Sequence, residues 1–130
     1  MTHFITAQDH VQLAIPAGGE DDADRFYVGV LGFEVVAKPE LLARRGGRWY
    51  VSGPVHLHLG VEEDFRPARK AHPAWRVRNL TRLRDRLVET GFIPRESHEI
   101  PGVIRVHVDD PFGNRLELID EETVSSSTTD

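Results

Sequence analysis

The sequence predicts an α+β fold of two similar units, each ordered as a strand, a helix and three strands (βαβββ), with the helices on one face. Three observations predict it: an internal repeat, alternating apolar and polar residues in strand-like segments, and helical spacing of apolar residues after the first strand of each half. The chain has 130 residues, 39% of them hydrophobic, which suits a soluble globular domain. Each half, at about 55 residues, is too small to bury a core alone, so the halves should pack together or exchange with a partner chain.

The first unit is predicted to span residues 9–61, after an N-terminal extension over 1–8. Acidic residues at 21, 22 and 24 fall in the first turn of its helix, where the helix dipole favours them, and Gly32 is placed to end that helix. The predicted elements are a strand over 9–15, a helix marked by Ala23, Phe26, Tyr27, Val30 and Leu31, and strands over 33–37, 48–51 and 55–59.

The second unit, residues 71–120, follows a charged linker over 62–70 and precedes a tail over 121–130 that we expect to be disordered. Its elements are a strand over 71–77, a helix marked by Leu80, Leu83, Leu87 and Val88, and strands over 92–95, 103–108 and 115–119. Gly91 matches Gly32 at an offset of 59 residues, and the same offset aligns Glu117 with His58. His10 and His72 are 62 residues apart, three more than this offset, and a longer loop before the first helix accounts for the three extra residues.

Strand parity predicts a polar face opposite the helices. Successive side chains point to opposite faces of a strand, and the apolar residues of each strand share the face that packs on the helices. Five strands deliver ionisable or metal-binding groups to the other, concave face: His10, His56, His58, His72, Arg105, His107, Arg115 and Glu117. A solvated sheet face also carries polar residues, but histidines at repeat-related positions favour a metal site.

Composition limits the chemistry. There is no cysteine, so any metal must bind to His, Asp or Glu, and imidazoles with one carboxylate suit Zn, Fe, Ni, Mn or Co. A net charge of −5 without a continuous basic stripe argues against nucleic acid. There is no apolar run of membrane-spanning length and no apolar signal core, so we expect a cytoplasmic protein with no membrane partner.

Three segments carry a family resemblance: DHVQL at 9–13, FYVGVLGF at 26–33 and DPFGNRLEL at 110–118. With them the chain resembles the vicinal oxygen chelate superfamily, which includes glyoxalase I, fosfomycin and bleomycin resistance proteins and extradiol dioxygenases. The resemblance covers roughly residues 9 to 120. It implies a cupped mixed sheet with helices on the outer face, one divalent metal ion and a homodimer.

The resemblance also implies roles for the polar face. The metal ligands fall on His10, His72 and Glu117, with a fourth at His58, or at His56 if the register shifts by two. Glu117, or the residue at the second symmetric position, acts as the catalytic base. The predicted substrate-binding residues are His56, Arg105, His107 and Arg115; a solvated strand face is the plainer interpretation for them.

The leading functional hypothesis is a glyoxalase-like metalloenzyme that polarises two neighbouring oxygens of a small metabolite, with lyase, isomerase or related chemistry. The sequence shows no recognisable glutathione site or monovalent-cation loop, and ring-cleaving relatives are normally longer. The alternative is a non-catalytic, bleomycin-resistance-like protein that binds a drug or metabolite. The substrate, the metal and the placement of the site within or between chains stay open.

Overall fold

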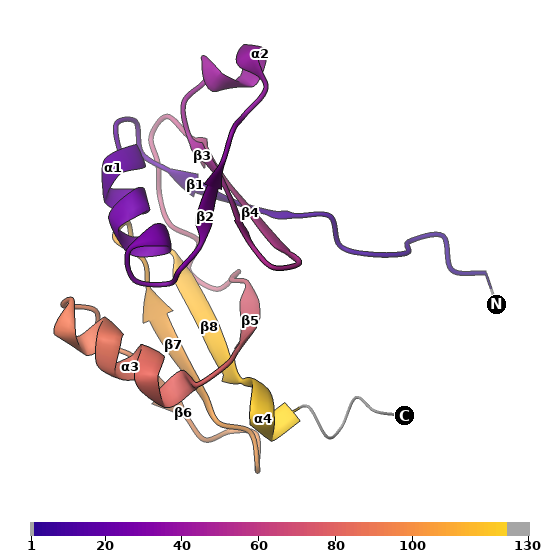
Figure 1. Ribbon diagram of the computed structural model, residues 1–130, viewed down its shortest axis with the longest axis vertical. Helices are drawn as coiled ribbons and strands as arrows, with labels where there is room; N and C mark the ends of the chain where they lie inside the picture. Colours follow the sequence, from indigo (N-terminus) through magenta and orange to yellow (C-terminus); the bar gives the residue numbers. More distant parts are fainter. Residues whose placement is uncertain (1, 125–130) are drawn as a thin grey trace.

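The computed structural model describes residues 2–124 and contains two βαβββ units in succession (Figure 1). The first consists of β1 (Val11–Ile15), α1 (Glu20–Ala23), the π-helical turn η1 (Asp24–Val28), β2 (Glu34–Val36), α2 (Glu40–Ala43), β3 (Arg48–Ser52) and β4 (Val55–Val61). The second consists of β5 (Ala74–Val77), α3 (Leu80–Glu89), β6 (Arg95–Ser97), β7 (Arg105–Asp109), β8 (Arg115–Asp120) and α4 (Glu121–Val124).

Each unit forms one four-stranded mixed sheet, in the orders β1-β4-β3-β2 and β5-β8-β7-β6. In both sheets the first strand is parallel to the last, and the other pairs are antiparallel. This arrangement confirms the predicted α+β fold of two repeated units.

Strand register also confirms the repeat alignment. In the first sheet Gln12 lies opposite His58, and in the second Ala74 lies opposite Glu117. A histidine stands two residues before Gln12 and another two residues before Ala74. His10 and His58 in the first unit therefore occupy the same relative positions as His72 and Glu117 in the second.

A single apolar core joins the units on the helix side, and Figure 1 shows α1 and α3 on the same side of the molecule. The rings of Phe26 and Phe92 lie 4.6 Å apart, and those of Phe33 and Trp75 lie 5.4 Å apart. Both pairs cross from one unit to the other. The strand residues predicted to face the helices all belong to this core. Most of them are buried, namely Ile15, Leu57, Leu59, Val106, Val108, Leu116 and Leu118, and the others, such as Val11 and Trp75, are partly buried.

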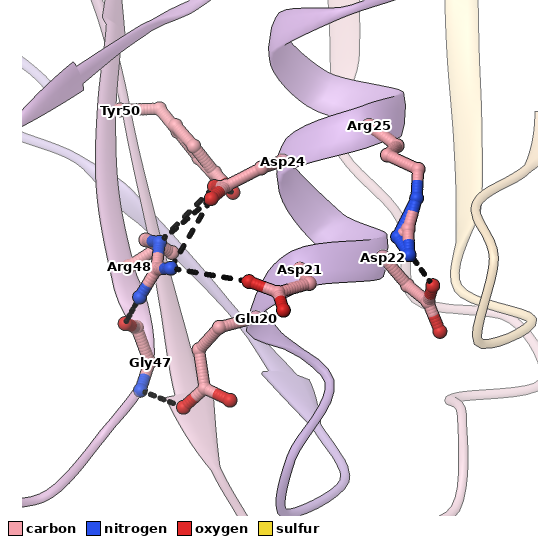
Figure 2. A network of polar contacts seen from close by, with 8 residues as sticks. All are labelled: Glu20, Asp21, Asp22, Asp24, Arg25, Gly47, Arg48 and Tyr50. Atoms are coloured by element: carbon pink, nitrogen blue, oxygen red, sulfur yellow. Dashed lines mark hydrogen bonds and ion pairs between the residues drawn. The ribbon is translucent and has the colours of Figure 1, made fainter.

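In the first unit, polar contacts attach the helix to the sheet (Figure 2). The carboxylate of Asp24 accepts hydrogen bonds from Nε of Arg48 (3.0 Å) and from the hydroxyl of Tyr50 (2.7 Å). Glu20 accepts a hydrogen bond of 2.8 Å from the backbone N–H of Gly47. Asp24, one of the three carboxylates predicted in the first helical turn, and Glu20, which was not among them, thus anchor the helix to the start of β3.

A buried carboxylate connects the two units. Asp110, in the turn between β7 and β8, accepts hydrogen bonds from the hydroxyl of Tyr27 (2.7 Å) and from the side-chain amide of Asn114 (3.0 Å). The same amide donates to the carbonyl of Ala14 in β1 (2.9 Å). The DPFGN turn therefore holds the second unit against the helix and the first strand of the first unit.

Some element bounds differ from the prediction. Pro73 is followed by the first residue of β5, so this strand is shorter than expected, and β6 begins only after Pro94. Proline cannot donate to a strand ladder, which accounts for both shifts. The expected disordered tail begins with one helical turn, α4, where Thr123 accepts a hydrogen bond from the N–H of Ile104 (3.2 Å); residues 125–130 of that expectation lie outside the described residues.

Candidate metal centre

His72 and Glu117 meet on the face of the second sheet that points away from the helices. His72 lies in the segment just before β5, and Glu117 lies in β8. The backbone N–H of Glu117 donates to the carbonyl of Pro73 (3.0 Å), which ties the two segments together. Nε2 of His72 then lies 3.0 Å from Oε1 of Glu117.

The contacts of the His72 ring define what can lie between these two groups. Nδ1 is 2.7 Å from the carbonyl oxygen of Lys70, and because a carbonyl only accepts, Nδ1 must carry a proton. A neutral ring with this tautomer has its lone pair on Nε2, facing the carboxylate of Glu117 with no proton between them. A second proton on the ring or a cation shared by both atoms satisfies this contact. Histidines that bind metals commonly donate their other N–H to a backbone carbonyl in this way.

His107 and Arg105, both in β7, complete the cluster. Nε2 of His107 lies 3.6 Å from Oε1 of Glu117, and Nη1 of Arg105 donates to Oε2 over 2.9 Å. Ligand atoms of His72, His107 and Glu117 all lie within 4.8 Å of one another. Two metal–ligand bonds of about 2.1 Å span at most about 4.2 Å, so the separations of both imidazoles from Oε1 fit a shared ion.

The electrostatics of the cluster favour metal binding. Burial alone raises the pKa of Glu117, but the hydrogen bond from Arg105 and the contact with His72 outweigh it and hold that pKa below its ordinary value. Burial lowers the pKa of His107, although Glu117 acts against this. Glu117 is therefore ionised and His107 neutral near pH 7, the forms in which these groups bind metals.

The equivalent face of the first unit holds a stack of rings. His58 lies between His10 and Trp49, with ring centroids 4.0 Å and 4.1 Å away. Nδ1 of His10 is 2.9 Å from Oδ2 of Asp9, which leaves Nε2 of His10 free to accept or to bind a metal. Burial lowers the pKa of His58, and the neighbouring His10 lowers it further.

The four predicted metal ligands therefore form two pairs in one chain, His10 with His58 and His72 with Glu117, each pair within its own unit. Neither His10 nor His58 belongs to the cluster around Glu117. A cavity of about 820 Å³ lies beside the first pair. It is lined by His10 and His56 from the first unit and by β5 residues such as Arg76 from the second.

The predicted substrate-binding residues occupy different surroundings. Arg105 and His107 both contact Glu117, and Nε of Arg105 has no hydrogen-bond partner among the described residues. Arg115 starts β8, two residues before Glu117 and on the same face, and His56 is exposed two residues before His58. The sequence assigned His107 to substrate rather than metal. The signal for its position was strand parity, which puts it on the same face as Glu117.

Comparison with known proteins identifies the family. The sequence matches the model of the Glyoxalase/Bleomycin resistance protein/Dioxygenase superfamily over residues 7–118. The chain therefore belongs to this superfamily, as the vicinal oxygen chelate resemblance indicated. No match was found among curated proteins. Within residues 2–124, no helix has the length and apolar character needed to cross a membrane.

Solved structures agree with this assignment. A protein from Bacillus anthracis, provisionally assigned to the glyoxalase family, is 42% identical over 92% of this chain and 98% of its own, with a TM-score of 0.88. The fosfomycin resistance protein FosX from Listeria monocytogenes is 12% identical over 90% of this chain and 94% of its own, with a TM-score of 0.73. TnmS3, an antibiotic binding protein from Streptomyces sp. CB03234, is 22% identical over 92% of this chain and 98% of its own, with a TM-score of 0.67. At such identities the last two show a shared fold alone.

Proposed function

We propose that this protein is a metal-dependent enzyme of the superfamily whose divalent ion (Zn, Ni, Mn, Fe or Co) binds to His10, His58, His72 and Glu117. The observation that carries the proposal is the 3.0 Å approach of Nε2 of His72 to Oε1 of Glu117, with Nδ1 of the same ring bound to a carbonyl. When bound, the ion acts as a Lewis acid that polarises two neighbouring oxygens of a small metabolite.

The residues around Glu117 have separate roles in this proposal. Arg105 holds Oε2 of Glu117, which turns Oε1 toward the imidazoles and keeps the carboxylate ionised. An ionised carboxylate at this place is the proposed base that takes a proton from the substrate. Arg115 and the unused donors of Arg105 provide positive charge for an anionic substrate, and His107 is the candidate to replace a ligand of the first unit.

We further propose that two copies of the chain build each site. In one chain the two pairs of ligands lie on separate sheets, and His72, His107 and Glu117 do not line the cavity beside His10. A second copy that places its first unit over the second unit of its partner brings His10 and His58 to Glu117 and also covers the open face. Such coverage excludes water from the reacting groups.

Metal content tests the proposed centre directly. The purified protein is expected to bind one divalent ion per chain, measured by elemental analysis and by calorimetric titration of the chelated protein. His72→Ala and Glu117→Gln should abolish stoichiometric binding. His98→Ala, which removes an exposed histidine directly after β6, should leave binding unchanged. Equal metal content in all four proteins would exclude the proposed ligands.

Mixing two inactive variants tests the shared site. If each site combines the first unit of one copy with the second unit of the other, a mixture of His10→Ala and His72→Ala chains should contain heterodimers with one intact site. Metal binding and turnover are then expected to return after the variants are unfolded and refolded together. A site built within one chain would show no recovery.

The alternative function is sequestration of a drug or metabolite without catalysis. Ligand affinity that is unchanged by chelation, in a protein without stoichiometric metal, would favour this function over the enzyme. The same titrations of chelated and metal-loaded protein therefore separate the two hypotheses.

A further inference from the structure

A second concave site lies between the units, where the helix-facing residues of β5 and β8 meet α3 and the first unit. It is a cavity of about 570 Å³ between the first turns of α3 and the segment that follows η1. Binding sites for small molecules typically have volumes of about 300 to 1,000 Å³. This cavity is therefore large enough for a metabolite of moderate size.

The floor of the cavity is apolar and aromatic. Trp75 of β5 and Leu118 of β8 come from the second sheet, Leu83 comes from α3, and Phe33 comes from the first unit. The indole of Trp75 packs edge-on against the ring of Phe33, with centroids 5.4 Å apart. Residues from both units thus form one apolar surface that remains accessible from the cavity.

Four arginines surround this floor: Arg76, Arg78, Arg82 and Arg86. Among the described residues that line the cavity, none is acidic. The chain as a whole has a net charge of −5, so this region differs in sign from the rest of the molecule. Concentrated positive charge over apolar walls attracts anions strongly, because the walls exclude water and focus the field.

Two of these four guanidinium groups have partners in the part of the chain that the structure describes, and the other two do not. Arg86 donates to the carbonyl of Gly29 (2.6 Å), and Nε of Arg78 lies 3.9 Å from Oε2 of Glu121. The side chains of Arg76 and Arg82, by contrast, have no hydrogen-bond acceptor or ion-pair partner within residues 2–124. Guanidinium groups pair with carboxylates and phosphates through two parallel hydrogen bonds, which suits an external anion.

We propose that this cavity binds a small organic anion, with its carboxylate or phosphate at Arg76 and Arg82 and its apolar body over Trp75. The site includes none of His72, His107 and Glu117 and needs no metal ion, although it adjoins the cavity beside His10 and shares Trp75, Arg76 and Arg78 with it. It gives the protein a second ligand site, formed where the two units of one chain meet.

Titration with a matched pair of probes tests the proposal. The tryptophan fluorescence of the full chain, kept in EDTA, is followed as 2-naphthoate or its neutral amide is added, and each affinity is checked by calorimetry. We expect saturable binding of naphthoate and at least about 10-fold weaker binding of the amide, since hydrogen bonds to charged groups contribute roughly a factor of ten in affinity. Naphthyl phosphate, titrated in parallel, distinguishes a carboxylate site from a phosphate site.

Variants locate the binding. Arg82→Ala and Arg76→Ala should each weaken naphthoate binding about 10-fold, whereas Arg44→Ala, which removes the same charge from an exposed position after α2, should leave it unchanged. Each variant is first compared with the parent by circular dichroism and thermal unfolding. Equal affinities for naphthoate and its amide, equal affinities in all three variants, or no binding because a second copy covers the cavity would each overturn the proposal.

Discussion

The two units use the same scaffold but carry different side chains at equivalent positions of their polar faces. Where the first unit has His58, the second has Glu117, and the residue opposite on the neighbouring strand is Trp49 in the first and His107 in the second. The first face therefore holds stacked rings, and the second holds a carboxylate between two imidazoles.

A further position explains why the charges differ. Two residues before His107 stands Arg105, and two residues before Trp49 stands Gly47. Gly47 has a φ of +84°, and a Cβ there would lie 2.1 Å from the carbonyl oxygen of Leu59. The first unit has no room for an arginine at this place. The comparison teaches that, of the two polar faces, that of the second unit combines an ionised acid with a cation that orients it, whereas that of the first unit supplies imidazoles.

The largest expected difference between the units is in metal affinity. Glu117→Gln should weaken metal binding by more than about 100-fold, because it removes the anionic ligand, whereas His58→Gln should weaken it by about 10-fold. Calorimetric titration of the chelated proteins with Zn²⁺ or Co²⁺ measures both changes. Equal losses would show that the two units contribute alike and would break the comparison.

Folding stability should also differ between carboxylates of the two units. Asp110 is 4% exposed and accepts hydrogen bonds from three residues, so Asp110→Ala should lower the free energy of unfolding by about 2 to 3 kcal/mol. Asp24 also receives a tyrosine hydroxyl, but its side chain is 32% exposed, and Asp24→Ala should cost about 1 kcal/mol. Urea unfolding measures both values. A larger loss for Asp24→Ala would contradict the role of the DPFGN turn as the joint between the units.

The arginines of the two units should affect metal binding differently. Arg105→Ala should lower metal affinity about 10-fold, as expected for a residue that positions a ligand, and Arg105→Lys should restore part of it. Arg48→Ala, which breaks the contacts with Asp24 on the helix side, should leave metal affinity unchanged and reduce stability only. Titration and thermal unfolding of the three variants separate these effects. Loss of metal affinity in Arg48→Ala would remove the distinction.

The smallest expected effect concerns the ring stack of the first unit. Trp49→Leu removes one neighbour of His58 and should lower the free energy of unfolding by about 0.5 to 1.5 kcal/mol. Metal affinity should change by less than about 3-fold, because Trp49 offers no ligand atom. Thermal unfolding with and without metal measures both quantities. A 10-fold loss of metal affinity would show that the stack orients His58 for binding.

Much of the architecture could be predicted because it depends on local patterns. Strand parity and the 59-residue offset aligned His58 with Glu117, and the observed register keeps that alignment. Features set by longer-range contacts escaped prediction. The sequence predicted a helix across η1 but not its π-helical winding, and the short helix α2 has no periodic signal. The helix α4 forms where its residues contact the chain before β7.

The sequence placed the predicted ligands on the polar face, two in each unit, but it left open whether the two pairs meet within one chain. Parity says which face a side chain occupies and says nothing of how two sheets are oriented. That orientation depends on apolar contacts between units, such as those of Phe26 with Phe92. The pairing of Arg105 with Glu117 likewise depends on the strand register. The sequence predicted that Arg105 binds substrate, whereas in the structure its side chain donates to Glu117, a proposed metal ligand.

The central claim is that a divalent ion binds between His72 and Glu117. A crystal structure of the metal-loaded protein, with anomalous scattering recorded at the absorption edge of the metal, tests it most directly. We predict one anomalous peak per chain, at about 2.0 to 2.2 Å from both Nε2 of His72 and Oε1 of Glu117. A peak elsewhere, with Nε2 of His72 and Oε1 of Glu117 still in direct contact and no ion between them, would contradict the account.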